Sequence, residues 1–75
     1  MTNSPEYRAR LNSYEEQRAV RMLAAGAVIA GHFNREFAAT VRAGLFRRGL
    51  VALDGGDVVL TRDGHAEHSS WRGKR

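Results

Sequence analysis

The chain has 75 residues, a formal net charge of +4 and no cysteine. This length fits one small domain with a modest core, and the absence of cysteine excludes disulfides and thiolate metal sites. No apolar run has the length of a membrane span or the pattern of a secretory signal, so we expect a cytoplasmic protein, or one in the host cytoplasm if a phage encodes it.

The first half of the chain predicts an N-terminal arm or short helix over residues 1–12, because Ser4, Pro5 and Glu6 favour a helix start. Ser13-Tyr14-Glu15-Glu16 fits a capping box, so a second helix is expected over 14–25. The short β-branched run 27–30 then predicts a buried strand.

Residues 34–48 have the clearest helical pattern, in which Asn34 is the expected cap and Gly49 the expected end. The apolar side chains that recur every four residues and form one stripe are Phe33, Phe37, Val41 and Leu45. We therefore expect a single helix over this range.

The Gly55-Gly56 pair between two apolar runs predicts a β-hairpin, with strands over 50–53 and 58–60. Thr61 is the expected cap of a short last helix, and residues 71–75 are expected to form a flexible basic tail.

Three segments together resemble winged helix-turn-helix domains: Leu45-Phe46-Arg47-Arg48-Gly49-Leu50-Val51, then Gly55-Gly56, then Leu60-Thr61-Arg62-Asp63-Gly64. In that family a recognition-type helix ends in Arg-Gly-Leu-Val and a two-stranded wing ends in Leu-Thr-x-x-Gly. The resemblance covers residues 14–66. It implies an α+β fold, a small winged-helix-like domain over 13–70 with two or three helices, a β-hairpin wing and a short C-terminal helix.

The resemblance also implies binding of double-stranded DNA, as in bacterial or phage regulators of transcription and accessory factors. Two features differ from the family pattern. The stretch before Gly49 is short for a complete set of three helices, unless residues 5–11 supply the first one. The wing tip carries Asp54 and Asp57, which would repel phosphate.

The basic residues are unevenly distributed along the chain. Residues 27–49 carry a net charge of +3 and residues 65–75 one of +2, whereas residues 50–64 carry −2. Eleven of the twelve basic residues are arginine, which forms paired hydrogen bonds with phosphate or carboxylate. A genome rich in G and C would explain this arginine content equally well.

On a helix over 34–48, the side opposite the apolar stripe would carry Arg35, Ala39, Arg42 and Phe46. Such a face fits the major groove of DNA, although an ordinary solvated face has the same composition. The candidate DNA-binding residues are Asn34, Arg35, Thr40, Arg42 and Arg47, with Arg62, Arg72, Lys74 and Arg75 as further backbone contacts.

The alternative is a protein-binding module, such as a phage-encoded inhibitor that docks on an acidic surface of a host complex. A phenylalanine on the polar side of a helix needs a neighbour to cover it, and the acidic wing tip suits a basic partner patch better than DNA. The candidate partner or dimer contacts are Tyr14, Met22, Phe46 and Trp71, and a homodimer would suit a palindromic DNA site.

No pattern indicates catalysis or a cofactor. His65 and His68 stand three residues apart beside Glu67, but no further ligand accompanies them, so we expect no metal site. The chain has no phosphate-binding glycine loop, no nucleophile elbow and no paired acid and base, so we expect neither an enzyme nor a small-molecule substrate.

Overall fold

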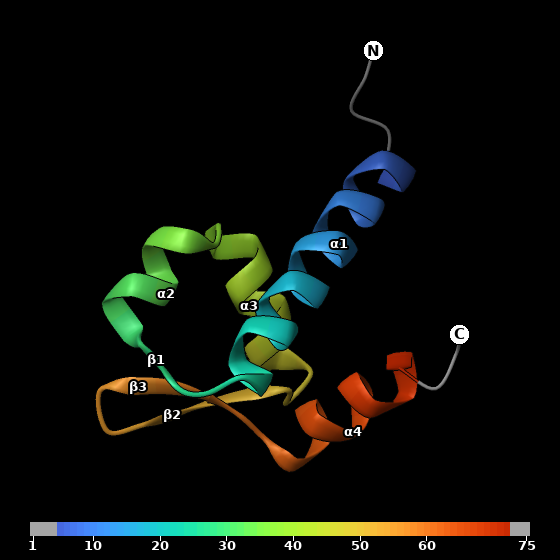
Figure 1. Cartoon of the computed structure of the whole chain (residues 1–75). Helices are drawn as coiled ribbons and strands as arrows, with labels where there is room; N and C mark the ends of the chain where they lie inside the picture. The colour runs from blue at the N-terminus through green and yellow to red at the C-terminus, as the bar shows by residue number, and fades with distance from the viewer. Residues whose placement is uncertain (1–4, 73–75) are drawn as a thin grey trace.

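The computed structural model describes the backbone of residues 5–72 and the side chains of residues 14–70 (Figure 1). Its elements, in chain order, are α1 (Pro5–Ala24), β1 (Val28–Ile29), α2 (Ala30–Glu36), α3 (Ala39–Arg47), β2 (Val51–Asp54), β3 (Asp57–Leu60) and α4 (Arg62–Arg72). The three strands form an antiparallel sheet in the order β1-β3-β2. The expected small α+β domain with a hairpin and a C-terminal helix is therefore confirmed.

The core lies where α1, α2 and α3 meet the inner face of the sheet. Its buried hydrophobic side chains are Ala19, Val20, Leu23, Phe33, Phe37, Val41, Leu45, Leu50, Val51, Val58 and Leu60. Burial of each large apolar side chain contributes about 1.5–3 kcal/mol, so this cluster is the main source of stability. In Figure 1, the N-terminal half of α1 extends beyond the other elements.

Helix α1 is one continuous helix, so the expectation of a separate short helix and a new start near Tyr14 was wrong. Pro5 occupies the first helical position, and no glycine or proline follows until Gly26. The glutamates of the capping box instead form ion pairs on the surface of α1, Glu15 with Arg18 and Glu16 with Arg48.

The expected single helix over 34–48 was also wrong, because α2 and α3 are separate helices joined by Phe37 and Ala38. Both joining residues have extended backbone, with φ −126° and ψ 141° at Phe37 and φ −65° and ψ 156° at Ala38. Asn34 lies inside α2 and is not a cap. The predicted strand is shorter than expected, since Ala30 already begins α2, and the expectation that it is buried was wrong, because Ile29 is exposed.

The apolar stripe survives this break, since all four of its members are buried. Phe33 and Phe37 stand on either side of the end of α2, with ring centroids 5.0 Å apart. Val41 and Leu45 continue the stripe from α3. The turn thus changes the direction of the chain while the side chains still enter one core.

Gly49 ends α3 as expected, and its φ of 73° is a conformation that glycine adopts without strain. The amides of Gly49 and Leu50 bond the carbonyls of Phe46 and Leu45, both at 3.0 Å, which is the Schellman pattern. This cap turns the chain directly into β2.

The predicted hairpin is present, and its register pairs Asp54 with Asp57 across the two-residue turn. Of the two turn glycines only Gly55 has a positive φ, at 65°, as in a type II′ turn. After β3, Thr61 caps α4, because its Oγ1 accepts a hydrogen bond from the Gly64 amide at 3.0 Å. The same hydroxyl donates to the Gly49 carbonyl at 2.6 Å and so links the hairpin to the end of α3.

Candidate nucleic-acid interface

Helix α3 has one buried side and one open side. Val41 and Leu45 are buried in the core, and Gly44 is buried against the side chain of Glu16. The exposed side chains are Ala39, Thr40, Ala43, Phe46 and Arg47, and we call this set the outer face of α3. It is formed by small residues, one hydroxyl, one arginine and one phenylalanine that is 40% exposed. No acidic residue lies on α3, so a polyanion meets no like charge on this helix.

Arg42 lies at the edge of the outer face, and its half-buried side chain turns back onto the protein. Its Nε donates to the carbonyl oxygen of Phe37 at 2.9 Å, and its Nη1 donates to Oδ1 of Asn34 at 3.4 Å. Arg42 therefore fastens α3 to the C-terminal end of α2. The expected basic face with Arg35 and Arg42 on one helix does not form, because Arg35 belongs to α2.

A second arginine supports the same turn from the side of α1. Arg18 donates hydrogen bonds to Glu15 at 2.8 Å and to Glu36 at 2.9 Å, and its guanidinium lies 4.6 Å from the centre of the Phe37 ring. The bond from Arg18 lowers the pKa of Glu36, and the two carboxylates raise the pKa of Arg18. Sequence reasoning missed this contact, because residues 18 positions apart leave no local signal.

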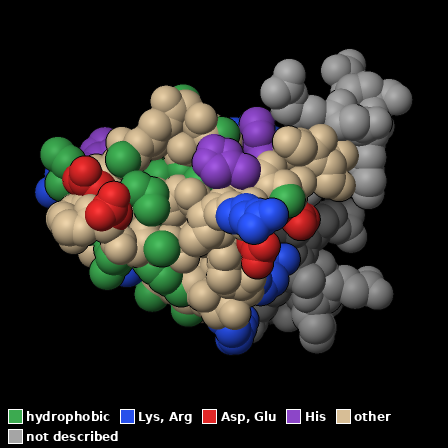
Figure 2. Space-filling model, turned by 90° about the horizontal axis from the view of Figure 1, so that it is seen from below, with side chains coloured by type: hydrophobic (Ala, Val, Ile, Leu, Met, Phe, Trp, Pro, Cys, Tyr) green, Lys and Arg blue, Asp and Glu red, His purple; other side chains and the backbone are tan. Residues whose placement is uncertain are grey.

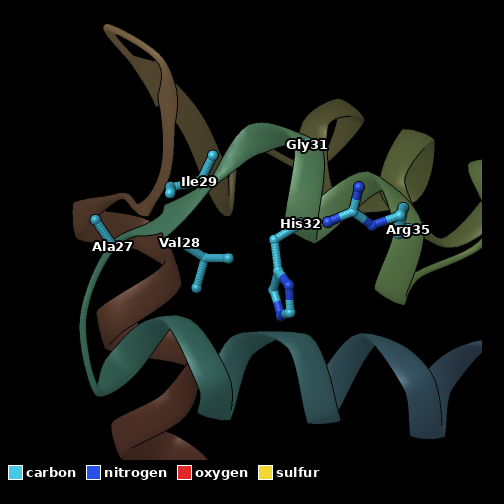
Figure 3. A pocket seen from close by; sticks show the side chains of 6 residues that line it. All are labelled: Ala27, Val28, Ile29, Gly31, His32 and Arg35. Atoms are coloured by element: carbon cyan, nitrogen blue, oxygen red, sulfur yellow. The ribbon is translucent and has the colours of Figure 1, made fainter.

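Arg35 is exposed on α2 and forms no ion pair with any described side chain. It borders an open groove whose other lining residues are Ala27, Val28, Ile29, Gly31 and His32 (Figure 3). Arg35 is thus available to an external anion.

Positive and negative side chains are concentrated in different segments of the described part of the chain. Residues 14–70 contain seven arginines and seven acidic residues, so they are neutral as a whole. Residues 30–49 nevertheless have an excess of three positive charges, and residues 50–70 an excess of three negative ones. Arg18 neutralises Glu36 and Glu16 neutralises Arg48, so these two ion pairs leave the positive excess of the segment at three. The α2–α3 segment is therefore the basic part of the described domain.

The hairpin tip is acidic, since Asp54 and Asp57 stand directly opposite each other on β2 and β3. In Figure 2, acidic side chains lie next to each other at one end of this view, beside hydrophobic ones. The tip is therefore unsuited to contact with phosphate.

The other residues singled out from the sequence are scattered over the domain. Arg62 is exposed at the start of α4, and Tyr14 is 58% exposed on α1. Met22 is partly buried and packs against the core, so most of its surface is used inside the domain. Trp71, Arg72, Lys74 and Arg75 have side chains outside the described residues.

Among the described residues, no group of three or more His, Cys, Asp or Glu side chains is arranged to hold a metal ion. No helix in the described part of the chain has the length and apolarity needed to cross a membrane.

Comparisons of this chain with protein-family models, curated proteins and solved structures find no match.

Proposed function

We propose that this protein is a small winged-helix protein that binds double-stranded DNA with the outer face of α3. The observation that carries the proposal is the combination of a solvent-open α3 without acidic residues and the positive excess of residues 30–49. In this proposal α2 and α3 are the helix-turn-helix, and the β2–β3 hairpin corresponds to the wing.

Helix α3 suits the major groove because its outer face is small at its N-terminal end. Ala39 and Ala43 let the helix backbone come close to the base edges, and the Thr40 hydroxyl can bond a base or a phosphate. Arg47 on α3 is exposed and would contact a phosphate beside the groove. Arg42 positions α3 rather than touching DNA, because its guanidinium is engaged with Phe37 and Asn34.

Because the hairpin tip is acidic, the wing of this proposed winged-helix domain would not contact DNA. Asp54 and Asp57 would be held away from the phosphates, so the contacts come from α3 and not from the wing. We therefore expect modest affinity for a single copy of the domain.

A protein-binding module remains the second candidate, and the exposure of Phe46 favours it. Phe46 lies on the outer face beside Ala39 and Ala43, which together give α3 an apolar surface. An acidic partner protein would meet the same positive segment. Aromatic anchors dominate such interfaces, so Phe46→Ala would remove most of the affinity for a protein but little of that for DNA.

Fluorescence anisotropy of a labelled mixed-sequence duplex tests the first candidate. We expect the affinity of the wild-type protein to fall about tenfold or more between about 50 and 200 mM salt, because bound arginines release counterions from DNA. Arg47→Glu should abolish binding at the higher salt.

Arg21→Glu is the matched control, since Arg21 and Arg47 both lie in the last turn of their helices and both are exposed. It changes the net charge equally and should retain most of the affinity. Equal losses of DNA affinity in the two variants would mean that the binding is only nonspecific charge attraction. Absence of binding at tens of micromolar protein in low salt would reject the DNA proposal.

A further inference from the structure

Strand β1 carries the most exposed large hydrophobic side chain among the described residues. Ile29 is 68% exposed, although it lies in a strand of the sheet. Its neighbour Val28 is half-buried and packs against the core, so Ile29 points to the outer side of the sheet. No described element covers it.

On one side of Ile29 lies the acidic hairpin tip. Ile29 is the register partner of Asp57, and Asp57 is the register partner of Asp54. Like charges directly opposite each other across a strand pair are destabilising, and neither carboxylate has an ion pair among the described residues. The tip would therefore be stabilised by an external cation.

On the other side of β1 lies the groove that Arg35 borders. None of its lining residues belongs to β3, so the groove opens at the free edge of β1. Figure 3 shows Ile29 near the hairpin and Arg35 at the opposite end of the groove. Acidic, apolar and basic groups thus follow one another across β1; we call Asp54, Asp57, Ile29 and Arg35 the β1 strip.

We propose that the β1 strip is the contact surface between two copies of this chain, related by a two-fold axis that passes close to Ile29. In such an interface the same patch occurs on both subunits in opposite directions. Ile29 would then pack against Ile29 of the other copy, and Arg35 would pair with Asp57 and Asp54 of the other copy. A second copy is the occupant that fits, because the strip contains both an unpaired cation and unpaired carboxylates on either side of an apolar centre.

This inference does not depend on the proposed function, because the association is expected without DNA. It gives the acidic hairpin tip a partner and explains why Ile29 and Arg35 are exposed together. It places the dimer contact at residues other than Tyr14, Met22 and Phe46.

Sedimentation velocity of the full chain, over about 1 µM to 1 mM protein at low salt, tests the proposal. We expect a reversible dimer that dissociates as salt is added, because the paired charges lie at the surface. Ile29→Ser should raise the dissociation constant about tenfold or more. Leu53→Ser is the matched control, since Leu53 is 63% exposed but its side chain alternates to the other face of the hairpin from Asp54.

Charge reversal gives a decisive arm of the same experiment. Arg35→Glu and Asp57→Arg should each weaken the dimer, and the double variant should recover most of the association because the opposite charges meet again. A wild-type protein that stays monomeric throughout the concentration range would overturn the proposal. So would a dimer that is insensitive to Ile29→Ser, or a double variant no better than the single ones.

Discussion

The side chain of Arg18 interacts with three neighbouring side chains at once. Its guanidinium bonds Glu15 on its own helix and Glu36 on α2, and it lies over the ring of Phe37. The pair with Glu36 thus joins the middle of α1 to the end of α2. Since these groups are near the surface, their contribution is modest and depends on pH and salt.

The lowered pKa of Glu36 leads to a prediction of pH dependence. A carboxylate whose pKa is lower in the folded state stabilises that state above its ordinary pKa, and the stabilisation is lost as the pH falls through the folded-state value. Glu36→Gln should therefore be less stable than wild type near neutral pH and equal to it in acid. Thermal unfolding across this pH range measures the difference.

The Arg18→Gln background is the control for this experiment. Without the guanidinium, Glu36→Gln should have little effect at any pH, because the coupling between the two groups is gone. A difference between wild type and Glu36→Gln that persists in acid would contradict the role assigned to the ion pair.

Gly64 is predicted to be intolerant of a side chain. It is buried in α4, and a Cβ there would meet the carbonyl oxygen of Leu50 and lie 2.6 Å from Cδ1 of Leu60. Gly64→Ala should lower the free energy of unfolding by about 1–3 kcal/mol, as overpacking does in other cores. Gly56→Ala is the control, because nothing lies within 4 Å of its Cβ position. Urea unfolding in which both variants match wild type would contradict the packing of α4 on the hairpin.

Some boundaries of the helices and strands could be predicted from the sequence, and others could not. The hairpin and the ends at Gly49 and Thr61 could be predicted, because local turn and cap chemistry determines them. The break between α2 and α3 could not, since Phe37 and Ala38 include no glycine or proline. Moreover, the apolar stripe keeps a spacing of four residues across the break, so periodicity alone describes one longer helix.

The candidate site could be predicted only in part for the same reason. Thr40, Arg35 and Arg47 were expected at the surface and are exposed. Arg42 was expected on the same open face, but its hydrogen bonds to Phe37 and Asn34 exist only because the chain turns between α2 and α3. The β1 strip was also beyond prediction, because it needs the pairing of β1 with β3.

Arg42 gives a prediction about the turn between these helices. Arg42→Gln should lower the free energy of unfolding by about 1–2 kcal/mol, because a half-buried carbonyl loses a charged donor. It should also weaken DNA binding at every salt concentration without changing the slope of log affinity against log salt. Arg47→Gln should instead reduce that slope by about 0.9, because a phosphate contact is removed.

Anisotropy titrations at several salt concentrations distinguish the two roles, with unfolding curves to correct for any unfolded protein. A smaller slope for Arg42→Gln would mean that Arg42 itself contacts phosphate and is not a positioning residue.

In the whole molecule, the net positive charge and the neutral part lie in different segments of the chain. The described residues 14–70 are neutral, and the net charge of +4 resides in residues 1–13 and 71–75. Within the neutral part, residues 30–49 have the positive excess, and Arg35 and Arg47 are its exposed, unpaired arginines. The negative excess lies in the hairpin and α4. This separation supports one basic face for DNA and a distinct strip for a second copy.

The most direct test of the DNA-binding face is an NMR titration of the isotope-labelled protein with a mixed-sequence duplex at low salt. We expect the largest shifts at the amides of Ala39 to Arg47, with little change at the hairpin tip. Shifts concentrated in α4 or at Asp54 and Asp57, with α3 unaffected, would contradict the claim that the outer face of α3 binds DNA.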